Sequence, residues 1–202
     1  MGYALDEGLL YLQHLKFLEE LTLEHILIRD VEILCTVLHG MHRLHYLHLN
    51  AYFGLLNINE VLIQLQNKAL FSNLETIKLS GRAIDLRGIG ALAEFKNLRI
   101  LSIKTWRRDI DSKDCWQRLF SSCQRLETVF LPRFSSIDEP LTLWKNLSEV
   151  ELRQISENPR TVAIPEQCHN LRIHVKESSI VDQLLENYPH LSICLYNDNN
   201  II

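Results

Sequence analysis

Apolar residues recur along the chain in one spacing: two variable residues separate the first apolar position from the second, and one separates the second from the third. The full copies are Leu18/Leu21/Leu23, Leu44/Leu47/Leu49, Leu74/Ile77/Leu79, Leu98/Leu101/Ile103, Leu126/Val129/Leu131 and Leu147/Val150/Leu152. Two copies lacking one residue of the spacing follow at Leu171/Ile173/Val175 and Leu191/Ile193/Leu195. The period of two in each copy predicts a short β-strand.

Between the strands the apolar period changes to about 3.6 residues, which is typical of a helix with one buried face. The sets with this spacing are Val31/Leu34/Cys35/Leu38, Trp116/Leu119/Phe120/Cys123 and Val181/Leu184/Leu185/Tyr188. Side chains that can cap the first turn stand nearby: Asp30, Ser112 or Asp114, Ser178 or Ser179, and, for two further helices, Asn59 and Asp85. Segments 134–145 and 154–170 contain prolines and little helical periodicity, so irregular or 3₁₀ structure is predicted there.

The repeat length is about 25 residues, since seven intervals span the 173 residues from Leu18 to Leu191. A strand and helix of this size cannot bury their apolar faces alone, so stacked units should share one core between a parallel sheet and a helical layer. A doubly wound α/β domain is the alternative, but Gly81, Gly88 and Gly90 form no glycine-rich first turn. Six side chains are predicted to be almost fully buried: Leu21, Leu47, Ile77, Leu101, Val129 and Val150.

Three segments combine a helix, a short turn with Cys or Pro, and a strand: residues 119–131 (LFSSCQRLETVFL), 168–171 (CHNL) and 184–191 (LLENYPHL). They resemble the repeats of F-box/leucine-rich-repeat proteins and their ribonuclease-inhibitor-like relatives. The resemblance implies an α/β fold, a right-handed leucine-rich-repeat solenoid with a curved parallel sheet and with helices and irregular segments on its convex side. It implies a single domain over residues 1–202 with about eight repeats.

The beginning of the chain has no recognisable F-box. Leu5, Leu9 and Leu12 already have the spacing of a helix from an earlier repeat, so we expect either a piece of a longer protein or a short protein with an atypical cap. Leu5, Leu9, Leu12 and Leu15 offer no polar cover for the first repeat. We therefore expect another chain, another domain or a dimer mate to cover this end.

The variable residues within each strand should point away from the helices, because strand side chains alternate. One row is predicted to hold Glu20, Tyr46, Thr76, Ile100, Thr128, Glu149, Arg172 and Ser192. The next is predicted to hold Thr22, His48, Lys78, Ser102, Phe130, Glu151, His174 and Cys194. A third row, just past the strands, begins with Glu24, Asn50, Ser80 and Lys104.

Apolar residues at these solvent-facing positions, flanked by charges, suit a protein or peptide ligand. The candidate protein-binding residues are Tyr46, Lys78, Ile100, Lys104 and Phe130, with Trp106 at the rim in the loop that follows the strand. Ile100 and Phe130 are expected to be exposed on adjacent strands. Two alternatives stay open: a solvated surface without a ligand, and a Trp106 side chain that packs under its own loop.

Catalytic and metal-binding patterns are absent from the sequence. His39, His42, His45 and His48 recur every three residues, but the run should cross from a helix through a turn into a strand, so the side chains should diverge. Cys123 and Cys168 fall at turns where they should fill core volume rather than act as nucleophiles. We find no nucleophile elbow, P-loop, HExxH or paired carboxylates. We therefore expect no enzyme activity, no metal and no cofactor.

Composition limits the cellular compartment and the classes of partner that we expect for the protein. Charges interrupt every apolar run before membrane-spanning length, and Asp6 and Glu7 stand where a signal peptide needs positive charge. Five widely spaced cysteines favour reduced thiols in the cytoplasm or nucleus. A formal net charge of −4 supplies no general attraction for nucleic acid or membranes.

These observations predict a protein-interaction scaffold, which the resemblance narrows to the substrate-recognition region of an F-box-type ubiquitin ligase. An adaptor that assembles a complex through its surface or N-terminal edge is the alternative. Nucleic-acid binding through basic residues near the C-terminus is a third hypothesis.

Overall fold

The computed structural model describes residues 6–24, 28–51, 56–66, 73–81, 84–105, 112–131, 148–152, 164, 166, 168–173 and 178–195. The side chains at positions 6, 7, 113, 149–152, 172–173, 178–180 and 195 lie outside this description. The predicted loop residue Trp106 and nearly all of segments 134–145 and 154–170 also lie outside it.

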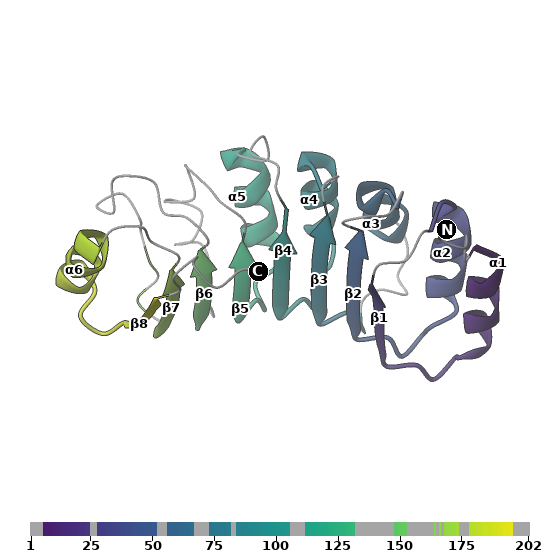
Figure 1. Cartoon of the computed structure of the whole chain (residues 1–202), viewed down its shortest axis with the longest axis horizontal. Helices are drawn as coiled ribbons and strands as arrows, with labels where there is room; N and C mark the ends of the chain where they lie inside the picture. Colours follow the sequence, from purple (N-terminus) through teal and green to yellow (C-terminus); the bar gives the residue numbers. More distant parts are fainter. Residues whose placement is uncertain are drawn as a thin grey trace.

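The described strands form one parallel sheet in which each strand pairs with the next along the chain (Figure 1). Its members are β1 (Glu20–Glu24), β2 (Tyr46–Ala51), β3 (Thr76–Gly81), β4 (Ile100–Lys104), β5 (Thr128–Leu131), β6 (Glu149–Leu152), β7 (Asn170–Ile173) and β8 (Ser192–Leu195). The predicted α/β class with a parallel sheet is therefore confirmed.

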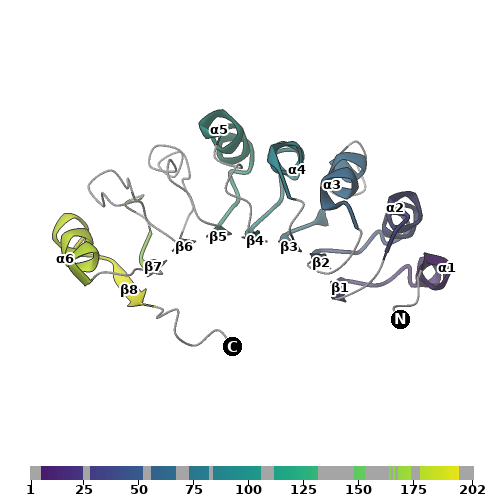
Figure 2. The ribbon, with the colours of Figure 1, turned by 45° about the horizontal axis from the view of Figure 1, so that its top comes forward.

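The helices lie on one side of the row of strands (Figure 2). They are α1 (Asp6–Leu9), the 3₁₀ helix η1 (Leu10–His14), α2 (Val31–His39), α3 (Ile58–Gln66), α4 (Leu86–Leu92), α5 (Lys113–Ser122) and α6 (Ser178–Asn187). We call the side of the sheet toward the helices the covered face. The other side, which bears Tyr46, Thr76, Ile100 and Thr128, is the open face, and no described helix or strand lies on it.

The covered face forms the core because each of the strands β1 to β5 directs two apolar side chains toward the helices. Leu47, Ile77, Leu101 and Val129 have no exposed surface, and Leu21 is 8% exposed. These five predictions of burial are confirmed, and the side chain of Val150 lies outside the description.

Helical spacing identified most of the buried positions on the helices, whereas Val31 and Tyr188 are only partly buried. All four residues of the α5 set, Trp116, Leu119, Phe120 and Cys123, are buried. In α6, Leu184 is buried but Leu185 is 39% exposed, so its predicted burial is wrong. An apolar position on the flank of a helix needs a neighbouring helix to cover it, and no described helix lies beside α6.

The predicted caps of α2 and α4 are confirmed. Asp30 accepts hydrogen bonds from the backbone N–H groups of Glu32 and Ile33, at 2.9 and 3.1 Å. Asp85 accepts from those of Arg87 and Gly88, at 2.9 and 3.4 Å. Each carboxylate thereby satisfies two donors that the first helical turn leaves without an intrahelical partner.

Three other caps differ from the prediction. Asn57, not Asn59, accepts the bond from the N–H of Glu60 at the start of α3, at 3.4 Å. Ser112 stands at the N-cap of α5 but makes no side-chain cap bond there. Ser178 is the first residue of α6 rather than the residue before it. In each case the cap geometry depends on where the incoming chain turns, and the sequence pattern does not specify this.

Asn59 instead joins two neighbouring helices. Its side chain is only 2% exposed, and its Oδ1 accepts a hydrogen bond from the backbone N–H of Asp85 at 3.0 Å. A Cβ atom added to Gly88 would overlap this Oδ1 atom. The glycine therefore lets α4 approach α3 closely enough for the bond to form.

The predicted alignment of β7 is wrong by two residues. Leu171 pairs with Val150 and Ile173 with Leu152, so Asn170 and Arg172 occupy the rows assigned to Arg172 and His174. The first apolar position of this repeat is then Cys168, which has no exposed surface. A fully buried cysteine behaves as a small apolar side chain, so it can replace the leucine found at this position in other repeats.

Candidate interaction surface

Strand register brings five of the six predicted binding residues onto neighbouring strands of the open face. Tyr46 and Ile100 lie in one row, where Thr76 on β3 separates them. Lys78 and Phe130 lie in the next row, separated by Ser102 on β4. Lys104 lies at the end of β4, opposite Ser80. The sixth residue, Trp106, is outside the described residues.

The expected exposure of Ile100 and Phe130 is confirmed only in part, because both side chains are partly exposed rather than fully exposed. Ile100 lies between Thr76 and Thr128 in its own row, and parallel strands are only about 4.8 Å apart. Neighbours in the row therefore cover the flanks of each side chain. Ile100 and Phe130 also lie in different rows, so they form a diagonal pair.

The ammonium group of Lys78 lies over the aromatic ring of Tyr46, with Nζ 5.1 Å from the ring centroid. This distance is within the range of a cation–π interaction. Both side chains are partly buried, and the contact holds the Lys78 charge on the open face. Among the described residues, no carboxylate forms an ion pair with Lys78.

His48 lies beside Lys78 on the open face, and the sequence analysis did not select it as a binding residue. Its Nδ1 is 3.3 Å from a carboxylate oxygen of Glu24 on β1. Burial lowers the pKa of His48, Glu24 raises it, and the positive charges of Lys78 and Lys104 lower it further, with a net decrease. The positive charges of Lys78 and Lys104 therefore both act on the His48 imidazole, so the two lysines belong to the same part of the surface.

Two serine side chains lie between these charges and were also missed. Ser80 on β3 is 5% exposed and Ser102 on β4 is 6% exposed. They are two of the three buried polar residues in the described chain, and both belong to open-face rows. The alternation of the strands could identify their positions, but burial depends on the larger neighbours around them.

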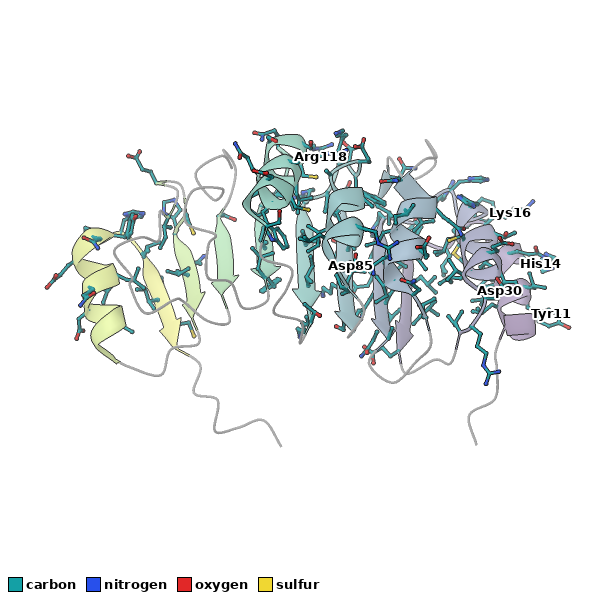
Figure 3. All side chains as sticks on the ribbon, turned by 90° about the horizontal axis from the view of Figure 1, so that it is seen from above. Tyr11, His14, Lys16, Asp30, Asp85 and Arg118 are labelled. Carbon is teal, nitrogen blue, oxygen red and sulfur yellow. The ribbon has the colours of Figure 1, made fainter. Side chains whose placement is uncertain are left out.

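A second surface lies at the N-terminal end. Four of the five large apolar side chains that are exposed in the described residues gather there: Leu10, Tyr11, Leu15 and Phe17. Tyr11 is 77% exposed and Phe17 is 75% exposed, while the guanidinium carbon of Arg43 lies 5.0 Å from the Phe17 ring centroid. Figure 3 shows Tyr11 and His14 pointing away from the molecule at this end.

The prediction that four leucines leave the first repeat uncovered is only partly correct. Leu9 is buried and Leu12 is partly buried, because α1 and η1 pack against α2. Leu15 is exposed as expected, whereas Leu5 lies outside the described residues. The apolar surface at this end is therefore built mainly by the aromatic residues Tyr11 and Phe17.

The residues weighed for metal or nucleophilic chemistry are dispersed or buried. His39 ends α2, His42 and His45 lie in the following turn, and His48 lies in β2. The described residues contain no group of three or more His, Cys, Asp or Glu side chains placed to hold a metal. Burial raises the pKa of Cys123 to about 12, which disfavours its thiolate.

None of the described helices is long and apolar enough to cross a membrane. No protein-family model matches the chain, and no curated protein matches it.

Proposed function

We propose that this chain is a protein-interaction module, built as a right-handed leucine-rich-repeat solenoid whose curved sheet binds a partner protein on its open face. The repeat of about 25 residues and the parallel strands that pair in chain order support this architecture. So does the layer of helices on one face only, because such units bury their apolar faces by stacking.

The observation that carries the function is the group of side chains on the central strands of the open face. Tyr46, Ile100 and Phe130 supply partly exposed apolar surface, and Lys78 and Lys104 add charge beside it. Interfaces between proteins combine an apolar, often aromatic centre with polar and charged surroundings. A sheet face without a covering layer of described helices leaves this group accessible.

The proposed role is binding without catalysis. In its specific form, suggested by the resemblance to F-box/leucine-rich-repeat proteins, the chain recognises substrates for a ubiquitin ligase in the cytoplasm or nucleus. The buried Cys123 thiol, with its raised pKa, does not have the character of a nucleophile.

Affinity purification with mass spectrometry tests this proposal with a matched pair of variants. The double variant Ile100→Ser/Phe130→Ser should fold normally and retain its partners about tenfold less well, because it removes apolar contact area from the open face. Leu185→Ser, which changes an exposed apolar residue of α6, should retain them like the wild type. Equal retention by all three proteins would show that the open face is not the binding surface.

The exposed Tyr11 and Phe17 support a second candidate, an adaptor that assembles a complex through its N-terminal end. Aromatic side chains with this much exposure are typical anchors of protein interfaces. Tyr11→Ser/Phe17→Ser should then release the partners that Ile100→Ser/Phe130→Ser retains. The opposite pattern would exclude the adaptor hypothesis.

A further inference from the structure

All the large apolar side chains that are exposed among the described residues lie at the two ends of the row of repeats. Leu10, Tyr11, Leu15 and Phe17 belong to η1 or to the turn after it, and Leu185 belongs to α6. Figure 2 shows α1 and α6 at opposite ends of the row of helices. Among the described residues, the helices between these ends expose no large apolar side chain.

Leu15 and Tyr11 occupy repeat positions that are buried elsewhere in the described chain. The N–H of Leu18 donates to the carbonyl oxygen of Leu15, and the same turn bond in other repeats ends at the buried residues Met41, Phe95 and Cys123. Tyr11 stands seven residues before Leu18, the first apolar residue of its strand pattern. The same position in other repeats is buried and is held by Val37, Ala91, Leu119 and Leu184.

The Tyr11 position faces the preceding repeat. Its counterpart in α5 is Leu119, which lies one helical turn after Cys115 and therefore on the same side of the helix. The thiol of Cys115 donates to the carbonyl oxygen of Leu86 in α4, with Sγ 3.4 Å away, so this side of α5 lies against the helix before it. No described repeat precedes α1 and η1, and the Tyr11 ring is accordingly exposed.

Leu185 lies on the opposite side of its helix, the side that faces the following repeat. It stands six residues before Leu191, a position that is buried in other repeats and held there by Leu38, Leu92 and Phe120. Cys35 lies one turn before Leu38 in α2, and its Sγ is 4.0 Å from the carbonyl oxygen of Val61 in α3. This side of α2 therefore faces the next helix, whereas in α6 the counterparts Asp182 and Leu185 are exposed.

The two ends also leave strand edges available. Of the described strands, β1 and β8 are the only ones that pair with a single neighbour. An edge strand presents N–H and C=O groups with which another strand can pair. A copy of the chain placed after β8 would supply α1, η1 and then β1, which continues the order of strand, helix and strand found within the chain.

Charge differs between the two ends in a complementary way. Residues 10–18 include His14 and Lys16, both exposed, and no acidic residue. Figure 3 shows these two side chains at the same end as Tyr11. Helix α6 contains Asp182 and Glu186, both exposed on either side of Leu185 in the sequence, and no basic residue. Opposite charges favour contact between unlike ends and disfavour contact between two like ends.

We propose that the chain associates head to tail with further copies of itself, so that α6 and β8 of one copy dock on α1, η1 and β1 of the next. Tyr11 and Leu15 of one copy then pack against Leu185 of the other, as buried apolar residues do between neighbouring repeats. Such an interface leaves one free end of each kind, so growth continues past a dimer unless the row closes into a ring. The inference goes beyond the proposed function, because it uses neither Ile100 nor Phe130 of the open face.

Analytical ultracentrifugation of the full chain over about a hundredfold range of concentration tests the inference. The average mass of the wild type should rise with concentration beyond that of a dimer. Tyr11→Ser/Leu15→Ser at the N-terminal end and Leu185→Ser/Glu186→Lys at the C-terminal end should each stay monomeric where the wild type associates. An equimolar mixture of these two variants should form a dimer and nothing larger, because it contains one intact end of each kind.

The variant Ile100→Ser/Phe130→Ser is the control, because it changes two side chains of the open face and should associate like the wild type. A wild type that is monomeric at every concentration would overturn head-to-tail association, and so would a mixture of the two end variants that stays monomeric. A dimer formed by the C-terminal variant alone would show that two N-terminal ends pair instead. These outcomes leave binding by the open face intact, and equal partner retention by Ile100→Ser/Phe130→Ser would overturn that function without affecting the association.

Discussion

The two faces of the sheet are built from alternate residues of the same strands, yet they differ in almost every property. On β4, Leu101 has no exposed surface and packs in the core, while Ile100 beside it is partly exposed on the open face. The covered face is a continuous apolar layer, whereas the open face carries lysines, a histidine and small polar residues. The difference means that the covered face supplies most of the buried apolar contacts, and that the side chains of the open face stay partly accessible to solvent, as the proposed binding function requires.

Thiol reactivity should show the largest contrast between the open face and the core beneath the covered face. Cys194 lies exposed on β8, whereas Cys123 is buried at the end of α5 and has a pKa raised to about 12. Because thiolates are the reactive form, Cys194 should react with a thiol reagent at least about a hundredfold faster at neutral pH. Mass spectrometry of a labelling time course measures this ratio. Cys194→Ser should abolish the fast phase of labelling. Denaturation of the wild-type protein should expose all five thiols. Fast labelling of Cys123 in the native protein would contradict the structure.

Core truncation should show the next largest effect. Leu101→Ala should lower the free energy of unfolding by about 2–5 kcal/mol, because it removes apolar contacts and leaves a cavity in the core. Ile100→Ser, one position away on the open face, should change it by about 1 kcal/mol or less. Urea denaturation followed by circular dichroism measures both. Similar losses in the two variants would show that the assigned faces are wrong.

A smaller effect is expected where α3 meets α4. Gly88→Ala should force Asn59 to move and break its bond to the Asp85 N–H, which lowers the free energy of unfolding by about 1–3 kcal/mol. Gly90→Ala in the same helix is the matched control, because its Cβ would approach nothing closer than Cys115 Sγ at 4.0 Å. That substitution should stabilise the protein by about 0.4–1 kcal/mol. Thermal unfolding of both variants measures the sign of each change in stability. Stabilisation by both substitutions would refute the close contact between Gly88 and Asn59.

Much of the covered face was predictable from the sequence because buried positions follow a regular spacing of apolar residues within each strand and helix. Leu47, Ile77 and Leu101 could be assigned from the spacing of apolar residues alone, and Asp30 and Asp85 from cap chemistry. Both signals depend on residues only a few positions apart. The spacing between full repeats also placed Lys78 beside Ser102 and Ser80 beside Lys104, and the strand register confirms these pairs.

The repeat that contains β7 shows where this reasoning fails. The apolar spacing predicted Leu171 as the first apolar residue of this repeat, although Cys168 occupies that position. Pairing between β6 and β7 decides the register, because shifting the strand would break its match with Val150 and Leu152. The apolar pattern contained both solutions, and only the neighbouring strand selected one.

The sequence by itself thus determined the class of fold, the order of strands and helices, and which residues of the full repeats face the core. The spacing of apolar residues predicts these properties because the hydrophobic effect buries apolar side chains, and strands and helices turn one face toward the core at regular intervals. Only the tertiary structure decided the exposure of Phe17 and Leu185, the burial of Ser80 and Ser102, and the contact of Lys78 with Tyr46. Each of these depends on side chains from other strands or helices, whose distance in space no local pattern specifies.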